Sequence, residues 1–409
     1  MTALVLAAAA ACTAGSHPAT THRTASAPAA GPPAGSQRPA HVAGAPGCST
    51  ATAAAPALHR VPTTMGPVPG APFGVAVTAD GRWAFVSLPG SGSVGVFRVG
   101  TAPVPTLIRQ VVSAGQPLGE SLTRNGRYLL AADDGAGAGV ISVSRAEQGQ
   151  PGAPLGMLNS PKGIGAIEVA TSPDSRFAFV SLEDSDTIAV FNLQRALTRG
   201  FGGGDFVGTI PAGIAPVGLA VSPDGRWLYA TSEIATMPRA ATGGVGQGTL
   251  TVISLDRAET NPAASVVATV TAGCSPVRVV TSADGRVVWV TARSSDRLLA
   301  FSAARLRTDP VHALIASVEV GEAPVGLVLA DRGQRMVVAD SNRFGTAGAA
   351  SSLAVVSVPQ ALAGKPALLG YLPAGGFPRE MALEPSGRTL LVTDFSSRQL
   401  EAIDAAGLP

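Results

Sequence analysis

The chain has 409 residues, 46% of them apolar and only 14% charged, which is the composition of a folded protein with a large buried core. Residues 1–56 contain Arg23 and Arg38 and no acid, so the formal charge of +2 arises there and the remaining 27 basic and 27 acidic residues cancel. A neutral body attracts polyanions weakly, and no later stretch of 18 apolar residues could span a membrane. The composition therefore argues against nucleic-acid-binding and membrane-spanning proteins.

The first twelve residues resemble a bacterial lipoprotein signal. The apolar run Ala3–Ala11 leads into Cys12, and residues 13–56 are rich in Ala, Pro, Ser, Thr and Gly. In such signals the cysteine becomes lipidated and a low-complexity tail tethers the folded domain. Two departures are the lack of a basic residue before the run and Ala9 where the motif usually has Leu. We expect residues 1–12 to direct export to the cell envelope, with the protein lipid-anchored at Cys12 or secreted, and residues 13–56 to be a disordered tether.

Two further cysteines are Cys48 in the tail and Cys274 in the later chain. They could form a disulfide in an oxidising compartment, and two unpaired thiols are the alternative. No Cys-x-x-Cys pair is present, so we expect no structural zinc site, no other metal and no cofactor.

Between Gly70 and Asp404 the chain repeats one pattern seven times, and the copy at Gly213–Thr231 is the clearest. Each copy has a Gly-x-x-Pro-like entry, an apolar run, a turn like Ser-Pro-Asp-Gly-Arg and two more apolar runs. The turns begin at Asp80, Asn125, Asp174, Asp224, Asp284, Arg332 and Ser386. Their spacing of 45 to 60 residues is the length of a four-stranded propeller blade. We predict an all-β fold: a seven-bladed β-propeller of four-stranded antiparallel blades over residues 57–409.

Within a copy, each run predicts one strand. The first, such as Val217–Val221, is apolar and β-branched, so it should be the innermost strand beside the central channel. The turn supplies Asp for a bond to its own backbone and Gly for a positive φ. The second strand carries the tryptophans, which we expect to pack between blades: Trp83, Trp227 and Trp289.

The seventh copy stops after its third strand, Gln399–Asp404, and so lacks an outer strand. The segment Ala57–Pro62 precedes the first copy and has no blade of its own. We predict that it completes blade seven and closes the ring, which removes exposed sheet edges.

The stretches Phe179–Phe191 and Ser222–Thr231 resemble the YVTN-type, YncE-like β-propeller repeat family, which is related to lactonase-like seven-bladed propellers. The resemblance covers about residues 57–409. It implies the propeller fold, whereas its members differ in function: envelope proteins of uncertain role, some implicated in nucleic-acid binding, and lactone hydrolases. The repeated residues make turns and strands, so they do not identify an activity.

Departures from the repeat identify candidate site residues. At the position of Gly218 three copies carry a charge instead of a small residue: Glu168, Arg278 and Glu380. Glu120 and Arg379 lie one residue away in the alignment. Loops after the second strands add Asp133, Asp134, Glu183, Asp184, Glu233, Arg293, Asp340, Arg343 and Asp394. These side chains should line the channel mouth, either as a solvated, mutually neutralising rim or as a polar funnel for a small ligand or a partner protein's side chains.

Three functions are compatible with this pattern. We expect a monomeric, non-catalytic binding or interaction module at the cell envelope, which contacts the membrane only through its lipid anchor. The first alternative is a lactonase-like hydrolase that uses the carboxylates of Glu168 and Glu380 beside Arg278. His-based chemistry is poorly supported, because only His312 falls inside the repeats and it lies near an outer strand. Nucleic-acid binding, the second alternative, conflicts with the neutral charge and an aromatic content of 4%.

Overall fold

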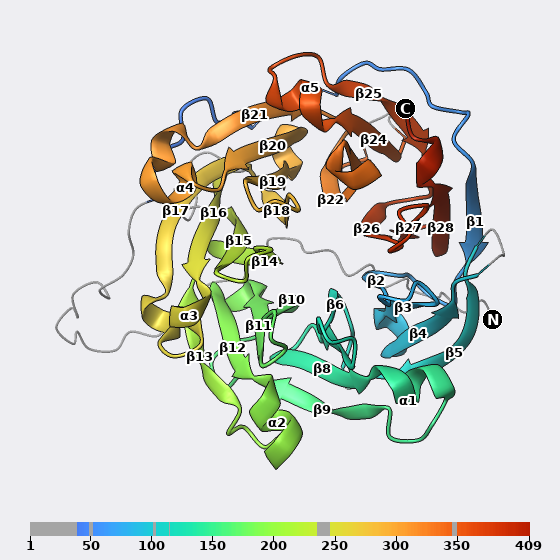
Figure 1. Cartoon of the computed structure of the whole chain (residues 1–409), viewed down its shortest axis with the longest axis vertical. Helices are drawn as coiled ribbons and strands as arrows, with labels where there is room; N and C mark the ends of the chain where they lie inside the picture. The colour runs from blue at the N-terminus through green and yellow to red at the C-terminus, as the bar shows by residue number, and fades with distance from the viewer. Residues whose placement is uncertain (1–38, 49–51, 101–103, 114, 235–245, 346–349) are drawn as a thin grey trace, which may run out of the picture. The chain divides into compact units, whose positions relative to one another are not determined.

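The computed structural model describes residues 39–48, 52–100, 104–113, 115–234, 246–345 and 350–409. Seven sheets, each of four antiparallel strands, stand radially around a central axis (Figure 1). In six of them the strands follow chain order from the innermost to the outermost. The predicted seven-bladed propeller is therefore confirmed.

The first three blades use consecutive strands. Blade one consists of β2 (Val75–Val77), β3 (Trp83–Leu88), β4 (Ser93–Arg98) and β5 (Thr106–Val112). Blade two consists of β6 (Glu120–Leu122), β7 (Tyr128–Ala132), β8 (Gly137–Ser142) and β9 (Pro154–Asn159). Blade three consists of β10 (Ala166–Thr171), β11 (Phe177–Leu182), β12 (Thr187–Asn192) and β13 (Phe206–Pro211).

Three further blades continue this order, and the last takes one strand from the other end of the chain. Blade four consists of β14 (Ile214–Val221), β15 (Trp227–Ile234), β16 (Gln247–Ser254) and β17 (Val266–Cys274). Blade five consists of β18 (Pro276–Thr281), β19 (Val287–Ala292), β20 (Arg297–Ser302) and β21 (Leu314–Glu319). Blade six consists of β22 (Pro324–Ala330), β23 (Arg335–Asp340), β24 (Ser352–Ser357) and β25 (Leu368–Pro373). Blade seven consists of β26 (Pro378–Leu383), β27 (Thr389–Asp394), β28 (Gln399–Asp404) and β1 (Thr63–Pro67).

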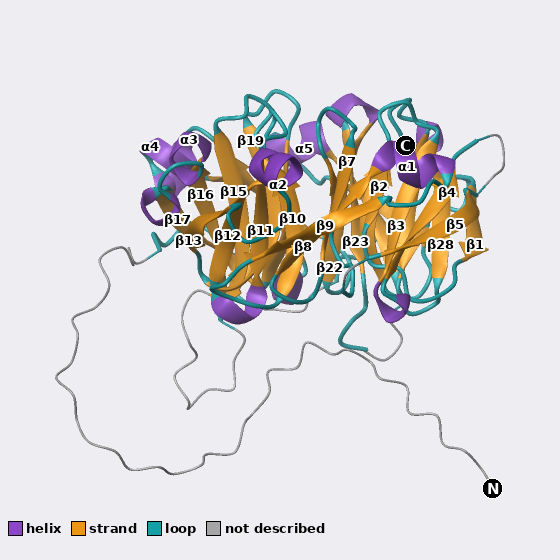
Figure 2. Ribbon diagram, turned by 90° about the horizontal axis from the view of Figure 1, so that it is seen from below, coloured by secondary structure: helices purple, strands orange, loops and turns teal. Residues whose placement is uncertain are grey.

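Short helices follow the third strands and lie on one face of the ring, which we call the helix face (Figure 2). They are α1 (Val143–Gln148), α2 (Leu193–Arg199), α3 (Leu255–Ala258), α4 (Arg305–Thr308) and α5 (Val358–Leu362). Single 3-10 turns are η1 (Pro89–Ser91), η2 (Glu183–Ser185), η3 (Pro262–Ala264), η4 (Arg293–Ser295), η5 (Pro310–His312), η6 (Asp331–Gly333) and η7 (Ala405–Gly407). In the described part of the chain no helix is long and apolar enough to cross a membrane.

The repeated turn explains each inner hairpin. In blade four the hydroxyl of Ser222 donates to Asp224 at 2.5 Å, and the same carboxylate accepts the amide of Arg226 at 3.1 Å. Gly225 between them has φ of +68°, a conformation that costs glycine nothing. The turn thereby satisfies its own polar groups and joins two buried strands.

A hydroxyl in the second strand ties each of five blades to the next. In blade four Thr231 accepts the amide of Gly218 at 3.1 Å and donates to the carbonyl of Val277 in blade five at 3.0 Å. Equivalent donors to the next blade are Ser87, Ser181, Thr291 and Thr393. The bond from Thr393 reaches Phe73, so it links blade seven to blade one.

The outer strand of blade seven lies later in the sequence than we predicted. It is β1, which pairs antiparallel with β28 from Thr63 opposite Ile403 to Pro67 opposite Gln399. The predicted segment Ala57–Pro62 forms no strand of blade seven: Leu58 donates to the carbonyl of Tyr371 in blade six at 2.7 Å, and Pro62 contacts blade seven, where it accepts the amide of Asp404 at 2.9 Å. The prediction was wrong because outer strands are half exposed, and β1 (Thr-Thr-Met-Gly-Pro) has no apolar pattern to mark it.

The described part of the predicted tether packs on the propeller. We call residues 39–48 and 52–58 the strap; Figure 1 shows it outside the ring on the way to β1. Ala40 forms a parallel bridge with Val270, and the fully buried Val42 joins the apolar core of blades four and five. Farther along, the hydroxyl of Tyr371 donates to the carbonyl of Ala53 at 2.7 Å. The strap thereby covers outer-strand edges that would otherwise stay open.

The three tryptophans occupy two kinds of environment. Trp289 is fully buried and packs with Met336 and Val338 of blade six. Trp83 and Trp227 are partly buried, and each ring carries an arginine over its face. All three thus contribute to packing rather than to an exposed stacking surface.

Candidate functional site

Three of the predicted site residues meet in the channel. Glu168 on β10, Arg278 on β18 and Glu380 on β26 hold equivalent positions in blades three, five and seven. The Nε of Arg278 lies 3.5 Å from Glu168 Oε2 and donates to Glu380 Oε1. Their side chains are 8%, 12% and 17% exposed for Arg278, Glu168 and Glu380. One buried guanidinium therefore joins two carboxylates across the ring.

The glycines at this position explain why three charges can converge. A Cβ on Gly218 would lie 2.4 Å from the carbonyl oxygen of Val277, and one on Gly326 would lie 2.1 Å from that of Arg379. Inner strands approach too closely there for any side chain. Glu168, Arg278 and Glu380 lie in blades three, five and seven, and the blades on either side of each carry glycine at this position.

Glu120, which begins β6, is the fourth member of this cluster. Both of its carboxylate oxygens are buried, and within the described residues neither has a hydrogen-bond partner. Burial, and next the neighbouring Glu168, raise the pKa of Glu120 well above its usual value. Burial also raises the pKa of Glu168 to about 8, although Arg278 opposes the shift. Burial therefore disfavours the charged form of both acids.

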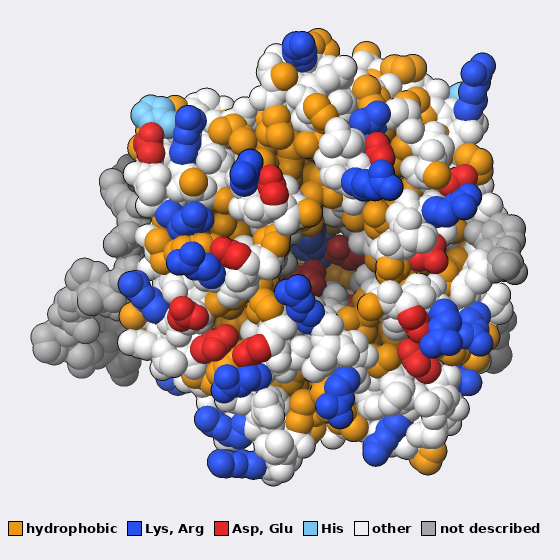
Figure 3. Space-filling view, in the orientation of Figure 1, with side chains coloured by type: hydrophobic (Ala, Val, Ile, Leu, Met, Phe, Trp, Pro, Cys, Tyr) orange, Lys and Arg blue, Asp and Glu red, His pale blue; other side chains and the backbone are white. Residues whose placement is uncertain are grey.

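The cluster can be reached from the helix face. Figure 3 looks onto this face and shows acidic and basic side chains deep in the central opening. A separate pocket of about 350 Å³ lies at the helix-face ends of the inner strands of blades two to four, and its lining includes no member of the cluster. Its lining includes Ser121 and Leu122, which follow Glu120, and Ala170, two residues after Glu168. This volume is sufficient for a small molecule.

A second ion pair joins blades four and five at the ends of their second strands. Arg293 Nη2 lies 2.6 Å from Glu233 Oε2, with side chains 12% and 17% exposed. Burial, and next Glu233, raise the pKa of Glu183 to about 7. Arg278 is paired with Thr291, only two residues before Arg293, so this ion pair lies in the same half of the channel as the cluster.

Arg379 does not line the channel as a free charge. Its guanidinium lies 3.7 Å from the ring centre of Phe73 and within 5.5 Å of those of Phe377 and Phe395. Such cation–π contacts hold a guanidinium in place. Arg379 therefore belongs to the packed entrance of blades one and seven.

Three further predicted acids lie at the loops after the second strands. Asp133 accepts the amides of Gly135 and Gly137, both at 3.0 Å. Asp340 and Asp394 end their second strands and are almost fully buried. We therefore assign these three residues to the hairpins between second and third strands.

Sequence reasoning missed Glu401 on β28. The residue is fully buried in blade seven, and among the described residues neither carboxylate oxygen has a hydrogen-bond partner. Burial, and next Asp394, raise its pKa to about 8. Comparing the third residue of each third strand would have found it, because the other copies have Gly95, Gly139, Ala189, Thr251, Leu299 and Ala354 there.

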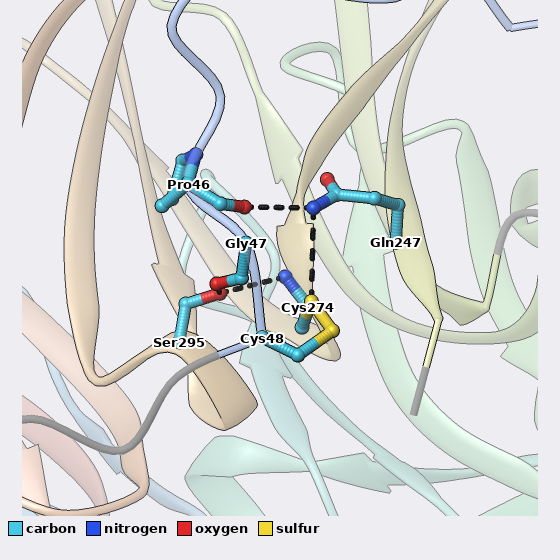
Figure 4. Close-up of a disulfide and its surroundings, with 6 residues drawn as sticks. All are labelled: Pro46, Gly47, Cys48, Gln247, Cys274 and Ser295. Carbon is cyan, nitrogen blue, oxygen red and sulfur yellow. Dashed lines mark hydrogen bonds between the residues drawn. A yellow bond between two sulfur atoms is a disulfide. The ribbon is translucent and has the colours of Figure 1, made fainter. Parts of the chain in front are cut away.

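Of the two alternatives for Cys48 and Cys274, the structure has the disulfide. Cys48 and Cys274 are bonded, with Cα atoms 5.3 Å apart (Figure 4). Beside the bond, Gln247 Nε2 donates to the carbonyl of Pro46 at 2.7 Å, and Ser295 Oγ donates to that of Gly47 at 3.0 Å. The strap therefore contacts η4, which carries Arg293. Cys12, the predicted lipidation site, lies outside the described residues.

Histidine and metal chemistry gain no support from the geometry. His312 is exposed and pairs with Asp309 at 3.0 Å on the outer side of blade five. Among the described residues, no group of three or more His, Cys, Asp or Glu side chains is arranged to hold a metal ion.

Comparison with known proteins gives one family match. A family model described as "Lactonase, 7-bladed beta-propeller" matches residues 172–343. Over these residues the chain is similar to the lactonase-like seven-bladed β-propellers, and its seven blades agree with that likeness. The match includes Glu233, Arg278 and Arg293 but neither Glu168 nor Glu380, and the narrower YncE-like resemblance stays a prediction.

Solved structures give a more distant likeness. A chain of Kuenenia stuttgartiensis hydrazine synthase is 16% identical, with a TM-score of 0.65 over 82% of this chain and 96% of that chain. At this identity the likeness shows the fold alone. No curated protein matches this chain significantly.

Proposed function

We propose that this lactonase-like propeller binds a small polar molecule in its channel, as a non-catalytic module at the bacterial cell envelope. The observation that carries the proposal is Glu120, a buried carboxyl whose two oxygens have no hydrogen-bond partner among the described residues, in the same cluster as the unpaired Nη2 of Arg278. Leaving such a group unpaired costs free energy that a bound ligand would recover.

The ion pairs of the neighbouring glutamates favour binding without reaction. Glu168 and Glu380 both contact the guanidinium of Arg278. A carboxylate engaged in an ion pair is a weaker general base and nucleophile than one left to activate water. The cluster is therefore better suited to hold charge than to transfer it.

Thermal-shift titration with a panel of small polar compounds tests the proposal. The panel contains amines, carboxylates, amino acids, sugars and lactones, and it is applied to wild type and to Glu120→Gln. We expect at least one class to raise the thermal midpoint of wild type in a concentration-dependent way and to act less on the variant. If no class does so, the binding proposal is wrong.

Lactone hydrolysis is the second candidate, favoured by the family match and by the pKa of Glu168 near 8. In that case Glu168 would protonate the leaving alkoxide and Glu380 would activate water, while Arg278 stabilises the oxyanion. Turnover of lactones by wild type and its loss in Glu168→Ala would replace the binding proposal with this one.

Export and anchoring complete the proposal. The disulfide between Cys48 and Cys274 supports an oxidising compartment, where such bonds persist. Metabolic labelling with a fatty-acid analogue tests lipidation: we expect label on wild type and none on Cys12→Ser. Equal labelling of both proteins would remove the anchor from the proposal.

A further inference from the structure

We infer that the channel ligand is a small zwitterion whose ammonium group binds at Glu120 and Glu168 and whose carboxylate binds at Arg278. The inference rests on the binding function proposed above and names the ligand class of the same site. Two features carry it: the unused acceptors of Glu120 and an unused donor on Arg278.

The acceptors belong to Glu120. Its two oxygens are buried and lack partners in the described residues, whereas the nearby Glu168 accepts only the amide of Val169, at 3.3 Å, besides its ion pair with Arg278. An ammonium group donates three hydrogen bonds and brings the positive charge that two neighbouring carboxyls lack. A neutral alcohol would supply one donor and no charge.

The donor belongs to Arg278, whose side chain is only 8% exposed. Its Nε contacts Glu168 and Glu380, and its Nη1 donates to the carbonyl of Val277 at 3.2 Å. Its Nη2 has no partner among the described residues. A carboxylate oxygen is the acceptor that a guanidinium nitrogen binds most strongly. The site therefore offers a negative end and a positive end to one ligand.

The charge of the cluster agrees with this assignment. The cluster holds three glutamates and one arginine, so it is acid-rich, and burial raises the pKa values of Glu120 and Glu168. A bound ammonium group would supply positive charge that favours the ionised forms of both acids.

Isothermal titration calorimetry of the full chain at pH 7.5 tests the inference. Three probes of equal carbon number distinguish binding of the ligand's ammonium group from binding of its carboxylate. The probes are 4-aminobutyrate, butylammonium and butyrate. We expect 4-aminobutyrate to bind at least about tenfold more tightly than either half, because each charged hydrogen bond contributes more than about 1.4 kcal/mol. Binding should release protons, which makes the measured heat depend on the ionisation enthalpy of the buffer.

Single substitutions test whether Glu120 binds the ammonium group of the ligand. Glu120→Gln should lose the advantage of 4-aminobutyrate over butyrate, whereas Glu147→Gln on α1 of the same blade should behave as wild type. The thermal midpoint of each unliganded variant shows that it is folded. An unchanged preference in folded Glu120→Gln overturns the assignment.

The outcomes also separate this inference from the binding function. If either half-probe binds as tightly as 4-aminobutyrate, or if only a neutral compound from the wider panel binds, the zwitterion inference fails and the binding function stands. If no probe and no panel compound binds, both fail.

Discussion

At the scale of single residues, the site depends on substitutions at positions where the repeat has small residues. Arg278 joins Glu168 and Glu380 because all three replace glycine at one level of the ring. Glu401 likewise replaces a mostly small residue inside blade seven. Each departure places a charge where apolar packing would be cheaper, which indicates a role beyond folding.

Replacing Arg278 by methionine should destabilise the protein. The change leaves two buried carboxyls without their cation, and we expect a loss of about 3–5 kcal/mol in the free energy of unfolding at pH 8. The loss should be smaller at pH 5, where the carboxyls can take up protons. Urea denaturation at both pH values measures it, with Arg286→Met at an exposed turn as the control that stays near wild type. A loss that does not depend on pH would contradict the charge argument.

Glu401 and Asp394 predict a second pH dependence. Burial raises their folded-state pKa values to about 8 and about 7, so the folded protein holds protons that the unfolded chain has lost above its ordinary value near 4. Stability should therefore be highest at low pH and fall as pH rises to about 8, by at most about 1.4 kcal/mol per pH unit for each group.

Denaturation profiles of Glu401→Gln between pH 5 and pH 8 test this dependence. The variant should show a flatter profile than wild type because its amide does not titrate. Glu384→Gln, at a hairpin turn, should keep the wild-type slope. Parallel profiles for wild type and Glu401→Gln would show that Glu401 is not the responsible group.

At the scale of elements, the hydroxyl of the second strand is the joint between blades. Thr231 bonds to Gly218 in its own blade and to Val277 in the next, and both bonds are buried. Backbone groups at the ends of inner strands would otherwise lose their partners. We therefore expect this serine or threonine hydroxyl to contribute to the stability of the contact between neighbouring blades.

Thr231→Val keeps the shape of the side chain and removes both bonds. We expect it to lower the free energy of unfolding by about 1–3 kcal/mol, because a buried amide and a buried carbonyl lose their partner. Thr106→Val on the exposed part of β5 should change stability by less than about 0.5 kcal/mol. Chemical denaturation of the two variants compares them, and equal small effects would mean that the interblade bonds are dispensable.

At the scale of the whole molecule, two contacts between distant parts of the sequence bind the ring together. β1 lies beside β28 in blade seven, and the bond from Cys48 to Cys274 joins residues 226 apart. Between them the strap follows the outer edges of blades four to six. The strap and β1 together thus contact blades four to seven.

Removing the disulfide should lower thermal stability. Cys48→Ser frees the strap beside β17, and we expect a loss of about 2–5 kcal/mol, within the range seen for native disulfides. Calorimetry with and without a reductant provides the measurement: reductant should lower the midpoint of wild type and leave that of Cys48→Ser unchanged. A variant as stable as oxidised wild type would show that the strap is held by its hydrogen bonds alone.

The sequence by itself determined the blade number, the inner three strands of each blade and the level at which Glu168, Arg278 and Glu380 meet. These features repeat, so local turn chemistry and apolar runs specify them at short range. Only the tertiary structure decided that β1 rather than Ala57–Pro62 completes blade seven, that Arg379 sits among three phenylalanines, and that Cys48 reaches Cys274. Each of these is a single long-range contact on a half-exposed edge or loop, where no periodic pattern records the partner.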